Sequence, residues 1–152
     1  MKPTITGLII GLALGIVIVA LVMPKLMVSE KVSPLGYDET IAHITRKAEA
    51  AGWKVSADMR LDKSLAKENK EVLPVASLKI CQPDYAEKVL LDDEARFLSV
   101  MMPCSIAVYE KADGKTYIST MNAGLMGRMF GGTAQSVMGG PVAKETREFV
   151  TF

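Results

Sequence analysis

The stretch TITGLIIGLALGIVIVALVM, residues Thr4–Met23, carries no charged side chain. As a helix it would cross the hydrocarbon core of a bilayer, which is about 30 Å thick and takes roughly 20 apolar residues. A cleavable signal peptide has a shorter apolar region followed by a small-residue cleavage site, whereas this stretch runs out as ALVMP at Ala20–Pro24. The sequence therefore predicts an uncleaved signal anchor that crosses a membrane once.

The charges on the two sides of this span differ little. Lys2 and the terminal amine precede it, while Lys25 and Lys31 follow it. Because a short N-terminal tail before a first span usually stays inside, we expect a single-pass protein of the cytoplasmic (inner) membrane whose soluble domain lies outside the cytoplasm. A domain that faces the cytoplasm is the alternative.

Gly7, Gly11 and Gly15 recur at every fourth position inside the span. In a helix this spacing places them on one face, where the backbone of a second helix can approach closely. We therefore expect helix packing within the bilayer, either between copies of the chain as a homo-oligomer or with a larger membrane complex.

The composition of the chain excludes several classes of function. Its 152 residues include 18 basic and 17 acidic side chains, and this near-neutral balance lacks the basic footprint of nucleic-acid binding. With one histidine and two cysteines, the chain cannot build a three-histidine metal centre, a four-cysteine zinc site or a dense disulfide framework. The sequence requires no cofactor, and we expect no nucleic-acid partner.

The pattern of apolar residues predicts one soluble domain in which strands and helices alternate. Strands are expected at 26–32, 53–61, 75–81, 104–110 and 115–121, and helices at 38–51, 83–91, 94–100 and 142–150. Asp38 is expected to cap the first of these helices, and Asp113-Gly114 to turn a hairpin. Trp53, Val55, Ala57, Met59 and Leu61 alternate with polar neighbours, as in a half-buried strand.

The predicted fold is α+β: an N-terminal transmembrane helix followed by one compact two-layer domain with a mixed sheet and packed helices. The expected segments are an N-terminal flank at 1–3, the signal anchor at 4–23, a juxtamembrane segment with a first strand at 24–33, the α+β domain at 33–121, and a Gly/Met-rich extension with a C-terminal helix at 122–152.

Three short motifs resemble a known family. They are Ile80-Cys81-Gln82-Pro83 with Ala86, Met102-Pro103-Cys104 leading into Ala107-Val108-Tyr109-Glu110, and Asp113-Gly114-Lys115, preceded by a helix that ends in Ala51-Gly52-Trp53. Together they resemble the bacterial and archaeal family called domain of unknown function 302, over about residues 33–121. The resemblance implies a compact α+β domain and no settled activity.

The sequence departs from this family pattern at two positions. Gln82 stands where Asn-Pro is expected, and Ser105 stands where a basic residue often follows Pro-Cys. The stretch from Met121 to Gly132 looks like the extension of a membrane-anchored subgroup of the family.

Cys81 and Cys104 are the candidate reactive residues. Cys81 precedes the helix that Pro83 opens, where unpaired backbone N–H groups favour an anionic thiolate, although a buried structural role is equally compatible with the pattern. Cys104 shares a strand face with Ile106 and Val108, which indicates core. A parallel arrangement of the two strands would separate the cysteines, and only an antiparallel one would bring them to the same rim.

The chain is rich in methionine, with 10 residues of this type. Thioethers combined with thiolates suit Cu(I), so Cys81, Cys104 and Met102 form a candidate soft-metal set, with haem as another ligand for such residues. The alternative is that Leu125, Met126, Met129 and Phe130 form core, a dimer surface or a patch that rests on a membrane. His43 is expected to face solvent and is a weak catalytic candidate.

These observations favour a membrane-anchored binding or accessory module over an enzyme, because no catalytic constellation stands out. Two alternatives stay open. One is a thiol-dependent redox or sulfur-handling protein that uses Cys81 with Cys104, and the other is a soft-metal or haem-binding protein.

Overall fold

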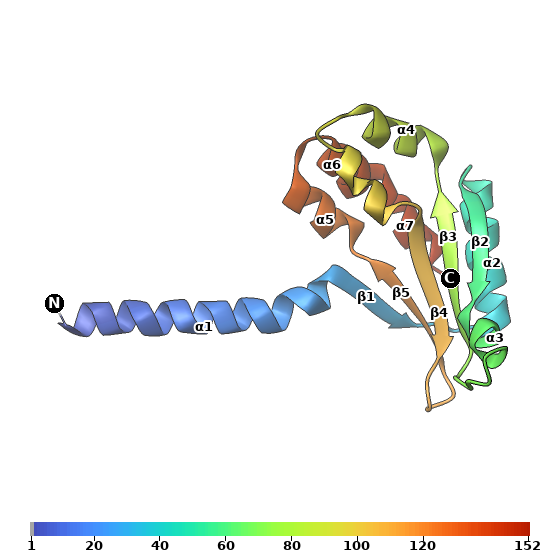
Figure 1. The fold of residues 1–152 in the computed structure, drawn as a ribbon, viewed down its shortest axis with the longest axis horizontal. Coiled ribbons are helices and arrows are strands. Elements are labelled where there is room, and N and C mark those ends of the chain that lie inside the picture. Colours follow the sequence, from blue (N-terminus) through green and yellow to red (C-terminus); the bar gives the residue numbers. More distant parts are fainter. Residues whose placement is uncertain (1) are drawn as a thin grey trace.

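The apolar stretch forms one long helix that projects from the rest of the chain. The computed structural model describes the backbone of residues 2–152 and the side chains of residues 10–152 (Figure 1). Helix α1 (Lys2–Met27) includes the window Ile10–Met27, whose mean hydropathy is 2.4 and of which 0% is buried. By length and composition, α1 can therefore cross a membrane.

The remaining residues form a five-stranded sheet with helices packed on it. The strands are β1 (Val28–Val32), β2 (Lys54–Arg60), β3 (Val75–Cys81), β4 (Cys104–Glu110) and β5 (Thr116–Met121). Their order is β1-β5-β4-β3-β2, and every neighbouring pair is antiparallel. The α+β class is confirmed.

The expected mixed sheet is wrong, and the connection between β3 and β4 gives the reason. Helix α4 (Pro83–Leu91) leaves the end of β3, and the short 3-10 helix η1 (Arg96–Met101) leads the chain back (Figure 1). The chain therefore re-enters the sheet at the same end of the strands from which it left, and β4 runs antiparallel to β3. A parallel pair would need a crossover that returns the chain to the other end of the strand.

The helices cover one face of the sheet and enclose the core with it. They are α2 (Tyr37–Ala50), α3 (Leu61–Ala66), α4, η1, α5 (Ala123–Phe130), α6 (Gly132–Val137), the π-helical turn η2 (Met138–Val142) and α7 (Ala143–Phe149). On β3, Ala76, Leu78 and Ile80 are fully buried, while the residues between them are half-buried. This alternation defines one face toward the helices and one open face.

A β-bulge in β2 changes which side chains face the core. Val55 lies opposite Ile80, but Ala57 lies opposite Lys79, so Ser56 is an extra residue. After the bulge the alternation predicted from the sequence is therefore reversed, because one inserted residue moves every later side chain to the other face. Arg60 consequently lies on the helix side of the sheet.

Asp38 does not cap α2, because the helix already begins at Tyr37 and places Asp38 inside its first turn, where it binds Arg60. The Arg60 guanidinium binds Asp38 at 2.8 Å and Asp58 at 2.9 Å, and these hydrogen bonds raise the pKa of Arg60. The N-cap of α2 is instead Gly36, whose N–H donates to Glu39 Oε2 at 3.4 Å. The first strand also starts later than expected, because α1 continues through Met27.

The Gly/Met-rich segment forms the helices α5, α6 and η2, which pack tightly against one another. Gly127 in α5 lies against the backbone of Gly139 and the carbonyl of Ala134. Gly131 and Gly132, between α5 and α6, have φ of 70° and 48°, a conformation that glycine adopts without strain. Gly127 and Gly139 therefore allow the helices to pack closely, while Gly131 and Gly132 allow the turn between α5 and α6.

Gly127→Ala tests this packing. Its Cβ would lie 2.4 Å from the Gly139 nitrogen and 2.9 Å from the Ala134 oxygen. Because both are backbone atoms, the helices must separate, and we expect the free energy of unfolding to fall by about 1–3 kcal/mol. Gly124→Ala is the control, since its Cβ would meet atoms no closer than 3.5 Å. Urea unfolding of the full chain in detergent, followed by Trp53 fluorescence, measures both, and equal losses would contradict the close approach.

Candidate functional site

The two cysteines lie at the same rim of the sheet. Cys81 is the last residue of β3 and Cys104 the first of β4, and the antiparallel register places Ile80 opposite Cys104. Cys104 points to the helix side with Ile106 and Val108, as expected, and the strand end allows Cys81 to line the same pocket. Both thiols are free and half-buried. Of the two strand arrangements considered from the sequence, the structure has the antiparallel one, which brings the cysteines to the same rim.

Several sulfur atoms line this pocket, which we call the sulfur-lined pocket. Besides the two thiols, three thioethers line it, from Met101, Met102 and Met138. Met101 ends η1, Met102 is the residue after it, and Met138 begins η2. The pocket is therefore assembled from the Ile80–Pro83 motif, the Met102–Cys104 motif and the C-terminal segment.

Burial controls the acidity of Cys104. Removal from water raises the pKa of its thiol above the ordinary 9.0, and negative charge on Cys81 raises it further. Cys104 is therefore protonated at neutral pH. In any thiol chemistry at this pocket it suits the second, resolving step rather than the first attack.

Gln82 and Ser105, which depart from the family pattern, have separate local roles. The Gln82 side chain caps α4 by accepting from the Tyr85 N–H at 2.9 Å, just before Pro83 at the first helical position. Ser105 accepts from Lys79 Nζ at 2.7 Å on the open face of the sheet. Gln82 therefore fixes the start of α4 beside the pocket that it lines, and Ser105 lies outside that pocket.

A hydrogen-bonded triad that the sequence analysis missed adjoins the pocket. The Trp53 indole N–H donates to Glu145 Oε2 and the Tyr85 hydroxyl donates to Glu145 Oε1, each at 2.6 Å. The bond to Glu145 and partial burial raise the pKa of Tyr85. Trp53 packs edge-on against Tyr85 and Phe149, with ring centroids 6.0 and 5.4 Å apart. Little in the sequence indicates this triad, because Glu145 is one of two glutamates in the C-terminal helix and nothing nearby in sequence marks it as a hydrogen-bond acceptor.

The free space in the pocket limits what it can hold. Its volume is about 40 Å³, and one water molecule needs roughly 10–15 Å³ on this measure. A metal ion or a ligand of a few atoms fits, whereas a macrocycle such as haem needs far more room. Within the described part of the chain, no group of three or more His, Cys, Asp or Glu residues could hold a metal. A metal here would therefore depend on the thioethers.

The other predicted residues lie elsewhere. On α5, Leu125 is half-buried and Met126 packs partly against the core, while Met129 and Phe130 are exposed. His43 is not simply solvated: its ring stacks on Phe152 at 4.4 Å, and its Nε2 lies 3.0 Å from the Thr151 oxygen. Gly11 and Gly15 have open space around them. The surroundings of Gly7 lie outside the part of the chain that the structure describes.

Comparisons with known proteins agree with this architecture. A family model described as "Domain of unknown function DUF302" matches residues 28–150, from β1 to the residue after α7. The crystal structure of an uncharacterized conserved protein DUF302 from Bacillus stearothermophilus has a TM-score of 0.70 and 19% sequence identity, and the match covers 82% of this chain and 95% of that chain. No curated protein matches the chain. The resemblance drawn from the sequence is confirmed, and the membrane-anchored subgroup stays a prediction.

Glu145→Ala tests the triad. It leaves the buried Trp53 indole and the Tyr85 hydroxyl without their acceptor, and an unsatisfied buried donor costs about 1–3 kcal/mol. The pKa of Tyr85 should also fall toward its ordinary 10.0. A raised tyrosine pKa makes stability decrease as pH rises above 10, because the unfolded chain loses its proton first, so the variant should show a smaller decrease.

Urea unfolding between pH 8 and 11, with tyrosine ring-carbon NMR for the titration, measures both effects. Glu148→Ala is the matched control, because Glu148 lies in the same helix, α7, and is exposed. A Tyr85 pKa that is the same in Glu145→Ala and in the control would contradict the bond.

Proposed function

The chain belongs to the DUF302 family, and we propose that it is a membrane-anchored binding module that uses the sulfur-lined pocket for a small ligand. One observation carries the anchor: the window Ile10–Met27 is uniformly apolar, with a mean hydropathy of 2.4, and 0% of it is buried against the domain. A core helix of a soluble protein would be covered by other elements. In water, residues 10–22 of α1 would leave their apolar side chains exposed, at a cost of roughly 25 cal/mol per Å².

The glycine face of α1 supports a second role for the span. Alanine carbons placed at Gly11 and Gly15 would meet nothing within 4 Å. These positions are therefore open to another helix, and we propose that a helix of a second copy or of a membrane complex packs there.

The pocket supports binding rather than catalysis. Its lining is almost wholly apolar and sulfur-bearing, and the carboxylate that its residues Trp53 and Tyr85 contact, Glu145, already accepts hydrogen bonds from both. A small apolar molecule would be held by burial against this lining. The proposed domain position is outside the cytoplasm.

Membrane extraction tests the anchor. The full chain should stay with the membrane after alkaline carbonate treatment. Leu14→Arg places a charge at the centre of the span, at a cost of about 2.5–3.5 kcal/mol, and should release a measurable fraction. Leu26→Arg, which follows Pro24-Lys25 and lies outside the uncharged stretch Thr4–Met23, is the control and should be retained.

Protease protection in cells that express the chain measures on which side of the membrane the domain lies. Protease added outside spheroplasts should digest the domain if it lies outside the cytoplasm. Recovery of the intact wild-type chain in the aqueous fraction would contradict the anchor.

A second candidate function is dithiol–disulfide exchange, favoured by the arrangement of Cys81 and Cys104 at one rim. The Cys81 thiolate would attack an external disulfide and release one thiol. Cys104 would then attack the mixed disulfide, release the second thiol and leave a Cys81–Cys104 disulfide, so that the two cysteines lose two electrons and two protons to the substrate. The same sulfur atoms would also suit Cu(I).

Oxidised glutathione tests this candidate. The full chain should lose both free thiols and carry no glutathione, as measured by mass spectrometry. Ring closure should accelerate as pH rises, because the raised pKa of Cys104 lies above 9.0 and only its thiolate attacks. Cys104→Ser is the control and should stop at a stable adduct on Cys81. A wild-type chain that also stops at this adduct rules the exchange out.

A further inference from the structure

Four apolar side chains form an exposed surface on η1 and α5, which we call the apolar patch. The exposed fractions are 57% for Phe97, 85% for Val100, 55% for Met129 and 46% for Phe130. Phe97 and Val100 are three residues apart in a 3-10 helix and therefore lie on one face of it. Phe97 contacts Phe130 edge to face, with ring centroids 5.6 Å apart. The patch therefore joins two separate elements.

The start of α5 is fastened to the end of α1. The Asn122 backbone N–H donates to the Met27 oxygen at 2.8 Å, and its side-chain Nδ2 donates to the Leu26 oxygen at 3.0 Å. Asn122 is also the N-cap of α5, because its Oδ1 accepts from the Leu125 N–H. One residue thus fixes both helices to each other.

The burial of α1 shows how far along it the domain reaches. From Ile10 to Met27, every residue is exposed except Met23 and Met27, which are half-buried. They lie four positions apart and so share one face of the helix, and α1 contacts α5. Met23 is the last residue before Pro24-Lys25, where the apolar span ends. The domain therefore reaches the level at which the span would leave the hydrocarbon core.

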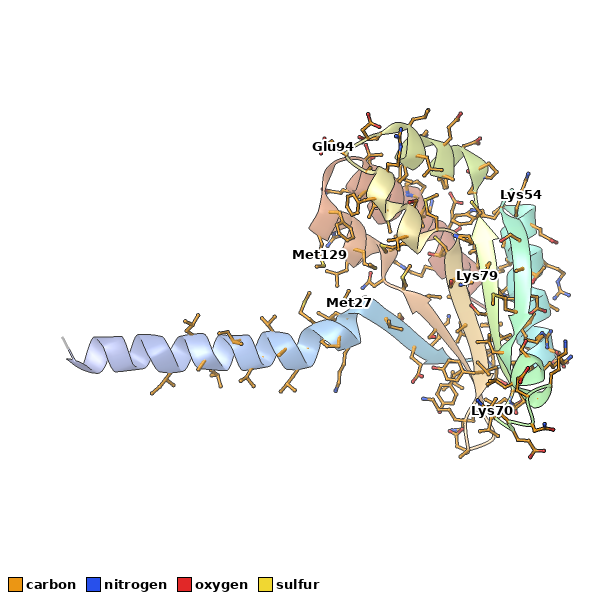
Figure 2. All side chains as sticks on the ribbon, viewed as in Figure 1. Met27, Lys54, Lys70, Lys79, Glu94 and Met129 are labelled. Carbon is orange, nitrogen blue, oxygen red and sulfur yellow. The ribbon has the colours of Figure 1, made fainter. Side chains whose placement is uncertain are left out.

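The patch lies at this same end of the domain. Figure 1 shows α5 directed back toward the side from which α1 departs. Figure 2 places the exposed Met129 and the loop residue Glu94 at that end, with Lys70 at the opposite end. A bilayer crossed by α1 would therefore meet the patch first.

The charges around the patch have both signs. Arg96 pairs with Asp93 at 2.9 Å, Glu94 is exposed beside them, and Arg128 precedes the patch residues of α5. Such a surface matches zwitterionic headgroups, because neither an anionic nor a cationic lipid would find one dominant charge.

We infer that the apolar patch inserts into the boundary between headgroups and acyl chains of the bilayer that α1 crosses. Interfacial apolar surfaces of this kind sit about 5–10 Å deep. The inference rests on the proposed anchor and adds a second membrane contact to it, so that the domain lies against the lipid instead of standing free on its helix.

Tryptophan probes test the contact in the full chain, reconstituted in phosphatidylcholine vesicles with bromine on the upper acyl carbons. Phe130→Trp and, independently, Phe97→Trp place a probe in the patch from either element. Leu73→Trp is the matched control, since Leu73 is 51% exposed and follows by three residues Lys70, which Figure 2 places at the far end. Trp53 contributes the same buried background to every variant.

The expected result is that brominated lipid quenches both patch probes at least about twofold more than the control, as the depth of an interfacial residue requires. A chain that floats with the vesicles but shows equal quenching at all three positions overturns the inference and leaves the anchor intact. Shielding of the patch probes from aqueous acrylamide without lipid quenching also overturns it, and shows that a second copy of the chain covers the patch. A wild-type chain that fails to float overturns both the anchor and the inference.

Discussion

The pairing of β1 with β5 attaches the apolar helix to the domain, and the other surfaces take their positions from it. Helix α1 ends at Met27 and β1 begins at Val28, so no flexible linker separates them. Val28 lies opposite Met121, and the next residue, Asn122, bonds back to the end of α1. Because β1 is the edge strand of a continuous sheet, the direction of α1 is set by the sheet itself.

The antiparallel β3–β4 pair has a comparable effect on the sulfur-lined pocket. Cys81 and Cys104 belong to opposite ends of their strands, and only opposite strand directions bring such ends to one rim. The pocket then needs α4 and η1 to double back over it. These elements supply Met101 and the Gln82 cap, and they exclude water from Cys104, which is why the pKa of that thiol rises.

The sequence predicted the elements with strong local signals and missed features that depend on packing. The bounds of β3, α4 and β4 agree with expectation, because Pro83 opens the helix and the strands alternate cleanly. The direction of β4 could not be predicted, since it depends on how the intervening helices fold back. The bulge at Ser56 inserts one residue without any composition signal. The Glu145 triad joins three distant segments, so no single stretch of sequence contains it.

Helix η1 links the two surfaces for which a role is proposed. Leu98 and Met101 line the sulfur-lined pocket, and Phe97 and Val100 belong to the apolar patch. Each pair is three residues apart, and side chains at that spacing eclipse in a 3-10 helix, so η1 presents one face inward and the neighbouring face outward. Where the apolar patch contacts lipid as proposed, a displacement of η1 therefore moves one wall of the pocket. In a pocket of about 40 Å³, even a small movement of that wall changes what can enter.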